Sequence, residues 1–294
     1  MGLFLPGTLE QPLPIVMYLH ACQNDPVYSS FWIISAANAI EPCAVFLPTA
    51  LPSIDHTCAD WGGTYDTGLR PNMVDALHEL DSLIDVYGFD TDRCYLYGES
   101  MGGEGVYRLL TDFPGRFAGG VTAAGYTINK GADKMARTPL WIFHGENDAI
   151  SSVDNARTIY QSILDAGGID VKYTEYPGLD HVPGLEAARS EPGLFEWLLA
   201  GSRSTLTRYF PEKKTGHRNA AVKMSCSTTG NLLCTAPLPA GSILTLYHLN
   251  GRMVFRATVG GTIIKLPSGI PDGGMLWRIM HPAFRYSGKI TFNR

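Results

Sequence analysis

The chain has few cysteines, few charged residues and no long apolar run, and each shortage excludes a class of protein. Six cysteines in 294 residues are too few for a small scaffold held together by disulfides. The apolar stretch 31–40 is interrupted by Ser35 and Asn38, and no run approaches the roughly 20 apolar residues that span a bilayer. We therefore expect no membrane-inserted segment. With 45% hydrophobic and 17% charged residues, the composition is typical of a globular protein with a sizeable core, which excludes disordered and fibrous classes.

Acidic residues are nearly absent from the last third of the chain. Residues 204–294 contain 2 acids and 12 Lys and Arg, whereas residues 1–203 contain 26 acids and 11 bases. This change of sign predicts two domains, 1–203 and 204–294, joined by the polar stretch 201–219. The bases of the second domain are scattered singly along strand-like segments, so we expect no nucleic-acid binding.

Two pairs of cysteines are candidates for disulfide bonds. Cys226 and Cys234 flank a turn-like segment, and a hairpin centred near Gly230 would place them opposite each other. Two buried free thiols are the alternative for this pair. Cys22 and Cys58 lie in loops expected at the same end of a sheet, which makes them a second, weaker candidate pair.

Short apolar runs alternate with segments of helical period in the first domain. The runs occupy residues 3–6, 15–20, 44–48, 94–100, 119–125, 140–145 and 171–176. Several are apolar on both faces, which is typical of buried parallel strands. Between them, apolar residues recur every three or four positions, and a last helix is expected over 185–199. The pattern predicts an α/β fold, a mainly parallel sheet covered by helices, with its site at the carboxyl ends of the strands.

A GxSxG motif ends the fourth of these runs. Residues 98–102 read GESMG, with a strand before them and a helix beginning near Met101, which is the strand, sharp turn and helix of a nucleophile elbow. A serine at this turn adopts a strained backbone conformation, and a side chain at either flanking glycine would collide across the turn. Ser100 is therefore the predicted nucleophile.

A serine nucleophile needs a basic histidine and an acid that orients it, and this elbow expects the chain order Ser, acid, His. Asp148 and His181 each follow a different predicted strand, so both are expected at the same sheet edge as Ser100. Glu146 and Asp180 are the competing acids. We favour Asp148 because Glu146 lies nearer the strand end, and because a residue adjacent to the base, such as Asp180, generally points elsewhere. Weaker candidates for the base, placed in a helix, at a strand end or in the second domain, are His78, His144, His217, His248 and His281.

Acyl transfer also needs two backbone N–H donors for the developing oxyanion, one just after the nucleophile and one from the loop after the third strand of the fold. Met101 supplies the first. The loop after the run 15–20 begins Ala21-Cys22, and we assign the N–H of Cys22 as the second donor.

Over nearly all of residues 1–203, the chain resembles the α/β-hydrolase esterases grouped with carbohydrate esterase family 1, feruloyl esterases and polyhydroxybutyrate depolymerases. The resemblance is carried by LHACQND (19–25), YLYGESMGGEGVYRLLTDFPGRFAGGV (95–121), PLWIFHGENDAI (139–150) and VKYTEYPGLDH (171–181). It implies a triad of Ser100, Asp148 and His181, and ester hydrolysis through an acyl-enzyme without metal or organic cofactor.

Two departures from the family stand out. The family has His-Gly after its third strand where this chain has His20-Ala21, so we expect an oxyanion loop of different shape. The chain also begins at what looks like the family's second strand, and we expect the family's first strand to be missing.

The second domain contains six or seven short strand-like segments separated by Gly, Pro and Asn turns, which predicts a small β-sandwich. The runs LTLYHLNGRMV (244–254), IKLPSGIPDGGMLWRI (264–279) and SGKITF (287–292) resemble the C-terminal sorting domains of type IX secretion. The resemblance implies a secreted or cell-surface protein and contact with secretion machinery. Because the chain starts without a signal peptide, we expect it to be truncated. A carbohydrate-binding module is the alternative, although Trp277 is expected in the core.

These patterns predict a secreted serine carboxylesterase that acts on feruloyl or acetyl esters of plant polysaccharides. Trp61 and Tyr65 lie in a glycine-containing loop expected over the strand ends, and an aromatic ring there could stack on a cinnamoyl ring or a sugar. Phe31 and Trp32 are expected to begin a helix and pack inward. The alternatives are a polyhydroxybutyrate depolymerase-like or general short-chain esterase, a serine peptidase and an inactive binding module on the same fold.

Overall fold

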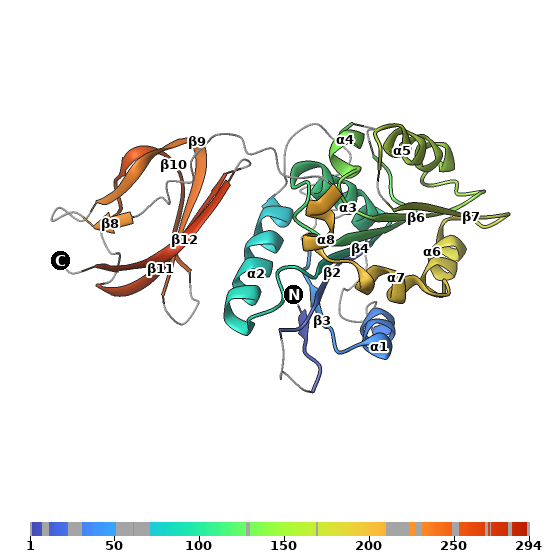
Figure 1. Ribbon diagram of the computed structural model, residues 1–294, viewed down its shortest axis with the longest axis horizontal. Coiled ribbons are helices and arrows are strands. Elements are labelled where there is room, and N and C mark those ends of the chain that lie inside the picture. Colours follow the sequence, from blue (N-terminus) through green and yellow to red (C-terminus); the bar gives the residue numbers. More distant parts are fainter. Residues whose placement is uncertain are drawn as a thin grey trace. The chain divides into compact units, whose positions relative to one another are not determined.

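The computed structural model divides the chain into two compact units, Met1–Pro211 and Glu212–Arg294 (Figure 1). The structure describes residues 2–7, 12–22, 31–50, 61, 71–127, 130–168, 170–209, 224–226, 231–248, 253–267, 270, 272–281 and 284–292. Each unit has its own sheet and its own hydrophobic core.

The first unit is built on a seven-stranded sheet of order β1-β3-β2-β4-β5-β6-β7. Its strands are β1 (Gly2–Phe4), β2 (Ile15–Leu19), β3 (Ala44–Leu47), β4 (Cys94–Glu99), β5 (Gly119–Ala123), β6 (Leu140–Gly145) and β7 (Val171–Tyr176). Strand β1 pairs antiparallel with β3, and every other pairing in the sheet is parallel. All seven predicted runs are strands, and the predicted mainly parallel sheet is confirmed.

Helices cover both faces of this sheet (Figure 1). They are α1 (Phe31–Ile40), α2 (Pro71–Tyr87), α3 (Met101–Asp112), α4 (Ala132–Met135), α5 (Val153–Asp165), α6 (His181–Arg189), α7 (Leu194–Ala200) and α8 (Arg203–Tyr209). Strand β2 shows why the runs are apolar throughout: Ile15, Met17 and Leu19 join one core cluster, whereas Val16 and Tyr18 join the other. In the described part of the chain, no helix is both long and apolar enough to cross a membrane.

The single helix expected over 185–199 is wrong. Helix α6 begins earlier, at His181, and stops at Arg189, and α7 starts anew at Leu194. The sequence between them contains Pro192, which has no backbone N–H to donate, and Gly193, which adopts a left-handed φ of 76°. The break leaves α6 as a separate short helix.

The boundary of the first unit lies later than the predicted division at 203/204. The polar stretch that was expected to be a linker begins with helix α8. Ser204 donates hydrogen bonds to the Asp92 carboxylate from both its N–H, at 2.8 Å, and its hydroxyl, at 2.6 Å. Leu206 is buried. These contacts tie α8 to the first unit, because a polar stretch can still place one apolar side chain inward at each helical turn.

The second unit is a five-stranded antiparallel sheet of order β10-β9-β11-β12, with β8 also paired to β9. Its strands are β8 (Met224–Cys226), β9 (Leu232–His248), β10 (Met253–Ile264), β11 (Gly273–His281) and β12 (Phe284–Phe292). The start of the long strand β9 pairs with β8 and its end pairs with β11. The described strands thus form the small all-β domain that the sequence predicts, with the long strand β9 joining all of them into one hydrogen-bonded sheet. Trp277 is buried in its core, as expected.

The candidate disulfide between Cys226 and Cys234 does not form, and the alternative of a free thiol holds for Cys234. Cys234 is a buried free thiol. Strand β8 pairs with β9 so that Cys226 faces Leu232 and Met224 faces Cys234. This register is shifted by two residues from the one that would place the two cysteines opposite each other. The length of the connecting turn sets the register of a hairpin, and the sequence pattern did not specify that length.

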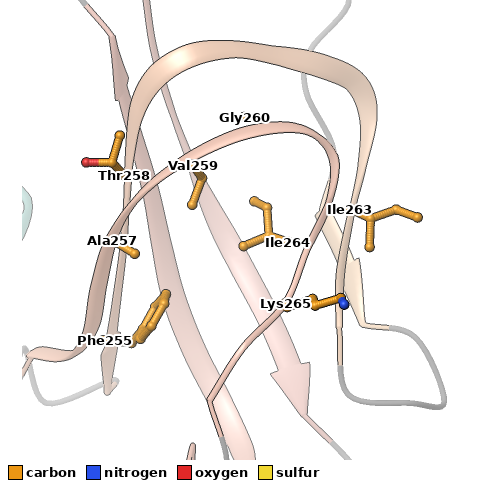
Figure 2. A pocket seen from close by; sticks show the side chains of 8 residues that line it. All are labelled: Phe255, Ala257, Thr258, Val259, Gly260, Ile263, Ile264 and Lys265. Atoms are coloured by element: carbon orange, nitrogen blue, oxygen red, sulfur yellow. The ribbon is translucent and has the colours of Figure 1, made fainter.

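Strand β10 and the residue that follows it line a hollow of about 220 Å³ in the second unit (Figure 2). Most of the residues that line it have apolar side chains, and Lys265 and Thr258 are the two with polar side chains. No histidine or carboxylate is among the described residues that line it. The hollow therefore offers no acid and base for hydrolysis.

A chain ending at Pro211 should keep the stability of the first unit, whereas a chain ending at Arg203 should be less stable. The shorter piece loses the bonds of Ser204 and the burial of Leu206, together worth about 2–3 kcal/mol. For a unit of this size, that corresponds to a fall in Tm of roughly 4–12 °C. Thermal unfolding followed by circular dichroism checks this, and equal melting temperatures would contradict it.

Candidate active site

Ser100 lies at a sharp turn between strand β4 and helix α3. Its backbone has a φ of 50° and a ψ of −118°, a conformation that a non-glycine residue adopts only under strain. A Cβ on Gly98 would overlap the carbonyl oxygen of Gly102, and a Cβ on Gly102 would overlap the carbonyl oxygen of Leu19. Both glycines are therefore required by close contacts of the backbone, as the motif predicts.

His181 and Asp148 reach Ser100 from two other strand ends. The hydroxyl of Ser100 is 2.9 Å from Nε2 of His181, and Nδ1 of His181 is 2.7 Å from Oδ2 of Asp148. Asp148 lies in the loop after β6, and His181 is the first residue of α6, which follows β7 after the short segment 177–180. The structure thus brings together the three residues selected from the sequence, although they are far apart along the chain. The carboxylate favours a proton on Nδ1, which leaves Nε2 free to accept the serine proton.

The competing acids are engaged elsewhere. Oε2 of Glu146 accepts a hydrogen bond of 2.8 Å from the N–H of Gly178. Asp180 caps α6, because its Oδ1 accepts from the N–H of His181 and the N–H of Ala149. These backbone donors lower the pKa of the Asp180 carboxyl. Asp148 is the acid among the three that contacts the imidazole of His181.

Comparisons with solved structures agree with this architecture. No family model matches the chain. A thermostable esterase matches with a TM-score of 0.56 and 22% identity, over 68% of this chain and 58% of that one. Esterase PE8 matches with a TM-score of 0.50 and 18% identity, over 64% of this chain and 95% of its own. The first unit has the α/β-hydrolase fold.

A curated protein is also similar to part of the chain. The bifunctional acetylxylan esterase/xylanase of Neocallimastix patriciarum is 28% identical over 151 residues, which are 50% of this chain. The match spans 21% of that protein's length.

In the α/β-hydrolase fold, the oxyanion donors come from the residue after the nucleophile and from the loop that follows β2 here. Met101 is the first residue of α3, where the backbone N–H has no acceptor within the helix. Gly102 packs against the carbonyls of Leu19 and His20, so the start of α3 lies next to the loop that holds Cys22. Cys22 is disulfide-bonded, and its predicted partner, Cys58, lies outside the described residues.

The loop after β2 is held by its own histidine. Nδ1 of His20 is 2.8 Å from the carbonyl oxygen of Ala21, and Nε2 accepts a hydrogen bond of 3.0 Å from the N–H of Ala50. Since Nε2 accepts, Nδ1 carries the proton and donates it to Ala21. The imidazole thereby fixes the Ala21 carbonyl, in the loop that follows β2.

Trp61 does not line a cleft, contrary to the prediction. Its side chain has no exposed surface, and its indole Nε1–H donates a 3.1 Å hydrogen bond to the carbonyl of His20. The ring also packs edge-on against the imidazole of His20. Trp61 is therefore a support of the loop after β2, because a buried indole needs an acceptor for its N–H and the loop offers one. Tyr65 lies outside the described residues.

The two aromatic residues at the start of α1 differ in burial. Trp32 packs inward against Tyr18, Tyr97 and Phe195, as expected. Phe31 is 61% exposed, so the expectation that it is core is wrong. Only one of two successive helix positions can face the sheet fully, since neighbours differ by about 100° around the axis.

A second histidine, His144, lies beside Asp148. Its position at a strand end made it a weaker candidate for the base from sequence alone. Its Nε2 is 3.2 Å from Oδ2 of Asp148 and 2.7 Å from the carbonyl oxygen of Ser151. Burial lowers the pKa of His144 below its ordinary value. A neutral His144 can donate its Nε2 proton to the Ser151 carbonyl while leaving the charge of Asp148 uncompensated.

The other oxygen of Asp148 is fixed by the backbone. Oδ1 accepts hydrogen bonds from the N–H groups of Ile150, at 2.9 Å, and Ser151, at 2.8 Å. These bonds hold the carboxylate plane toward His181. Among the described residues, no group of three histidine, cysteine or acidic side chains could hold a metal ion.

Replacing His144 with glutamine should weaken the pH dependence of stability. In the unfolded chain the pKa of a histidine is about 6.5, and in the folded protein it is lower, so the unfolded state binds the proton more readily. The stability is therefore fully present above about pH 6.5 and declines as the pH falls toward the folded pKa. Glutamine keeps an N–H donor near the Nε2 position but does not titrate.

Urea unfolding at several pH values checks this prediction. Between pH 7 and pH 5, the free energy of unfolding of the unaltered protein should fall more steeply than that of His144→Gln, by up to about 1.4 kcal/mol per pH unit. Identical slopes would show that His144 titrates alike in the folded and unfolded states.

Proposed function

We propose that the protein is a serine carboxylesterase that hydrolyses carboxylic esters through an acyl-enzyme on Ser100. The observation that carries the proposal is the continuous chain of hydrogen bonds from Ser100 through His181 to Asp148. The strained turn at Ser100 supports it, because an elbow of this kind exposes the hydroxyl at a helix N-terminus. The printed name of the curated relative, an acetylxylan esterase/xylanase, supports the same class of reaction.

In the proposed mechanism, Oγ of Ser100 attacks the ester carbonyl while Nε2 of His181 takes its proton. Asp148 holds the imidazole in the required tautomer and stabilises the imidazolium that forms. The N–H groups of Met101 and Cys22 donate to the oxyanion of the tetrahedral intermediate. His181 then protonates the leaving alcohol, and a water molecule activated by the same Nε2 releases the acid. This route uses no metal or organic cofactor.

We propose feruloyl or acetyl esters of plant polysaccharides as the substrates. The support is the resemblance of residues 1–203 to esterases of that kind and the acetylxylan esterase named in the curated relative. The burial of Trp61 removes one argument for an aromatic substrate. A polyhydroxybutyrate depolymerase-like or general short-chain esterase is therefore the alternative, and only a substrate comparison separates them.

For the second unit we propose a role in export or attachment at the cell surface, not in the chemistry. The support is the resemblance of its strand segments to type IX sorting domains. All three triad residues belong to the first unit. Secretion by a type IX host tests this role, with the same signal peptide added to the whole protein and to a chain ending at Pro211. Equal secretion of the two would contradict it.

Ser100→Ala tests the proposed function. The unaltered protein should hydrolyse p-nitrophenyl acetate, methyl ferulate and acetylated xylan, and should leave a peptide p-nitroanilide intact. Ser100→Ala should lose at least about a thousandfold in kcat/KM on every ester, because the nucleophile is gone. Retained ester hydrolysis in this variant would contradict the proposal, and cleavage of the anilide at a comparable rate would favour a peptidase.

Asp148→Asn should reduce kcat on p-nitrophenyl acetate by roughly ten-thousandfold, because the amide favours the wrong imidazole tautomer. Glu146→Gln is the matched control, two residues away in the same loop. Its carboxylate contacts the Gly178 backbone and not His181, so kcat should stay within about threefold. The reverse ranking in steady-state kinetics would move the acid role to Glu146.

A further inference from the structure

An ion pair with a buried carboxylate lies next to the nucleophile in the chain. Glu99 precedes Ser100 at the end of β4 and has no exposed surface. Arg189 donates to both of its oxygens, from Nε to Oε1 at 2.7 Å and from Nη2 to Oε2 at 2.6 Å. A two-bond fork of this kind fixes the distance between the groups and also their relative orientation. No motif marks this pair in the sequence.

Two further side chains complete the surroundings of the pair. The hydroxyl of Tyr18 donates a 3.0 Å hydrogen bond to Oε2 of Glu99. The guanidinium carbon of Arg189 lies 5.5 Å from the ring centre of Trp32, so the indole covers its face. Both oxygens of the Glu99 carboxylate therefore accept hydrogen bonds, from Tyr18 on β2 and Arg189 on α6, as a buried charge requires. Trp32 on α1 covers the guanidinium of Arg189.

Helix α6 connects this pair to the triad. It begins at His181 and ends at Arg189, so its two ends contact two consecutive residues of the chain. The N-terminal end contacts Ser100 through His181, and the C-terminal end contacts Glu99 through Arg189. Nine residues of helix span only about 13 Å, and a rotation or slide of α6 would break the fork and the Ser100–His181 bond together.

We propose that Glu99 and Arg189 are positioning residues that hold His181 at hydrogen-bonding distance from Ser100. The proposal rests on the proposed function, since it concerns how the base reaches the nucleophile. Placing a base within hydrogen-bond reach requires an accuracy of well under 1 Å, and a displacement of about 1 Å can cost a hundredfold in rate. The fork supplies that accuracy because its two hydrogen bonds fix the relative orientation of the groups, and because its carboxylate is fully buried and adjacent in the chain to the nucleophile.

The matched control is a second buried ion pair in the same unit. Nη2 of Arg116 is 2.8 Å from Oδ1 of Asp81, whose side chain is also almost completely buried. Neither residue contacts Ser100, His181 or Asp148 in the bonds described above. Arg116→Met and Arg189→Met therefore both leave a buried carboxylate without its arginine, but only the second removes a contact of α6 with the nucleophile strand.

The experiment measures kcat and KM for p-nitrophenyl acetate, the rate at which phenylmethylsulfonyl fluoride modifies Ser100, and the melting temperature. Arg189→Met should lower kcat and the modification rate by about 10- to 100-fold, with KM changed less than threefold. Arg116→Met should lower the melting temperature comparably and leave both rates within threefold. Arg189→Lys should recover part of the loss, because it restores the charge but not the fork.

A double variant guards against misfolding. Glu99→Gln with Arg189→Met leaves no unpaired buried charge, so it should melt close to the unaltered protein and still show the loss of both rates. The proposal is overturned if this folded double variant keeps both rates, or if Arg189→Met loses no more rate than Arg116→Met. Slow ester turnover in the unaltered protein, together with rapid modification of Ser100, would count against the proposed function. The positioning role would then be tested by comparing the modification rates of the unaltered protein, Arg189→Met and Arg116→Met.

Discussion

The close approach of helix α3 to strand β2 is the contact on which the candidate site depends. Gly102 lies so near the carbonyl of Leu19 that no side chain fits between them. This contact places the first turn of α3 beside the loop after β2, and Ser100, at the start of that turn, has a strained backbone with a φ of 50°. Burial of the neighbouring strands stabilises this strained turn, because β4 is completely buried between two helical layers. The placement of the Ser100 hydroxyl beside a helix N-terminus is a consequence of this one tight turn.

Charge in the site is organised around Asp148, which is itself nearly buried. One of its oxygens accepts two backbone N–H groups, and the other is shared between His181 and His144. Burial keeps the pKa of His144 low, so this second imidazole does not neutralise the carboxylate. The negative charge therefore remains available to the imidazolium that would form on His181 during ester hydrolysis.

The two units bury their hydrophobic cores against different kinds of sheet. The first has a parallel sheet with a cluster on each face, so each of its central strands needs apolar residues at successive positions. The second has one antiparallel sheet, in which the long strand β9 pairs with different partners at its two ends around a single cluster. Ser100, His181 and Asp148 all belong to the first unit.

The sequence by itself determined the features that depend on local sterics and chain order. Strand positions followed from runs apolar on both faces, the turn at Ser100 followed from two glycines that must lack a Cβ, and the order of Ser100, Asp148 and His181 followed from which strand each succeeds. Tertiary packing decided the rest. Whether Asp148, Glu146 or Asp180 contacts the imidazole depends on which way each carboxylate turns within its loop.

Other outcomes depended on partners that are distant along the chain. Trp61 is buried, and its indole N–H donates a hydrogen bond to the carbonyl of His20, 41 residues earlier in the chain. The free thiol of Cys234 reflects a shift in hairpin register that the flanking residues do not specify. The fork between Glu99 and Arg189 joins groups 90 residues apart. Periodicity and motifs report which face of an element is buried, but the choice of partner across the core is made only when all the elements pack together.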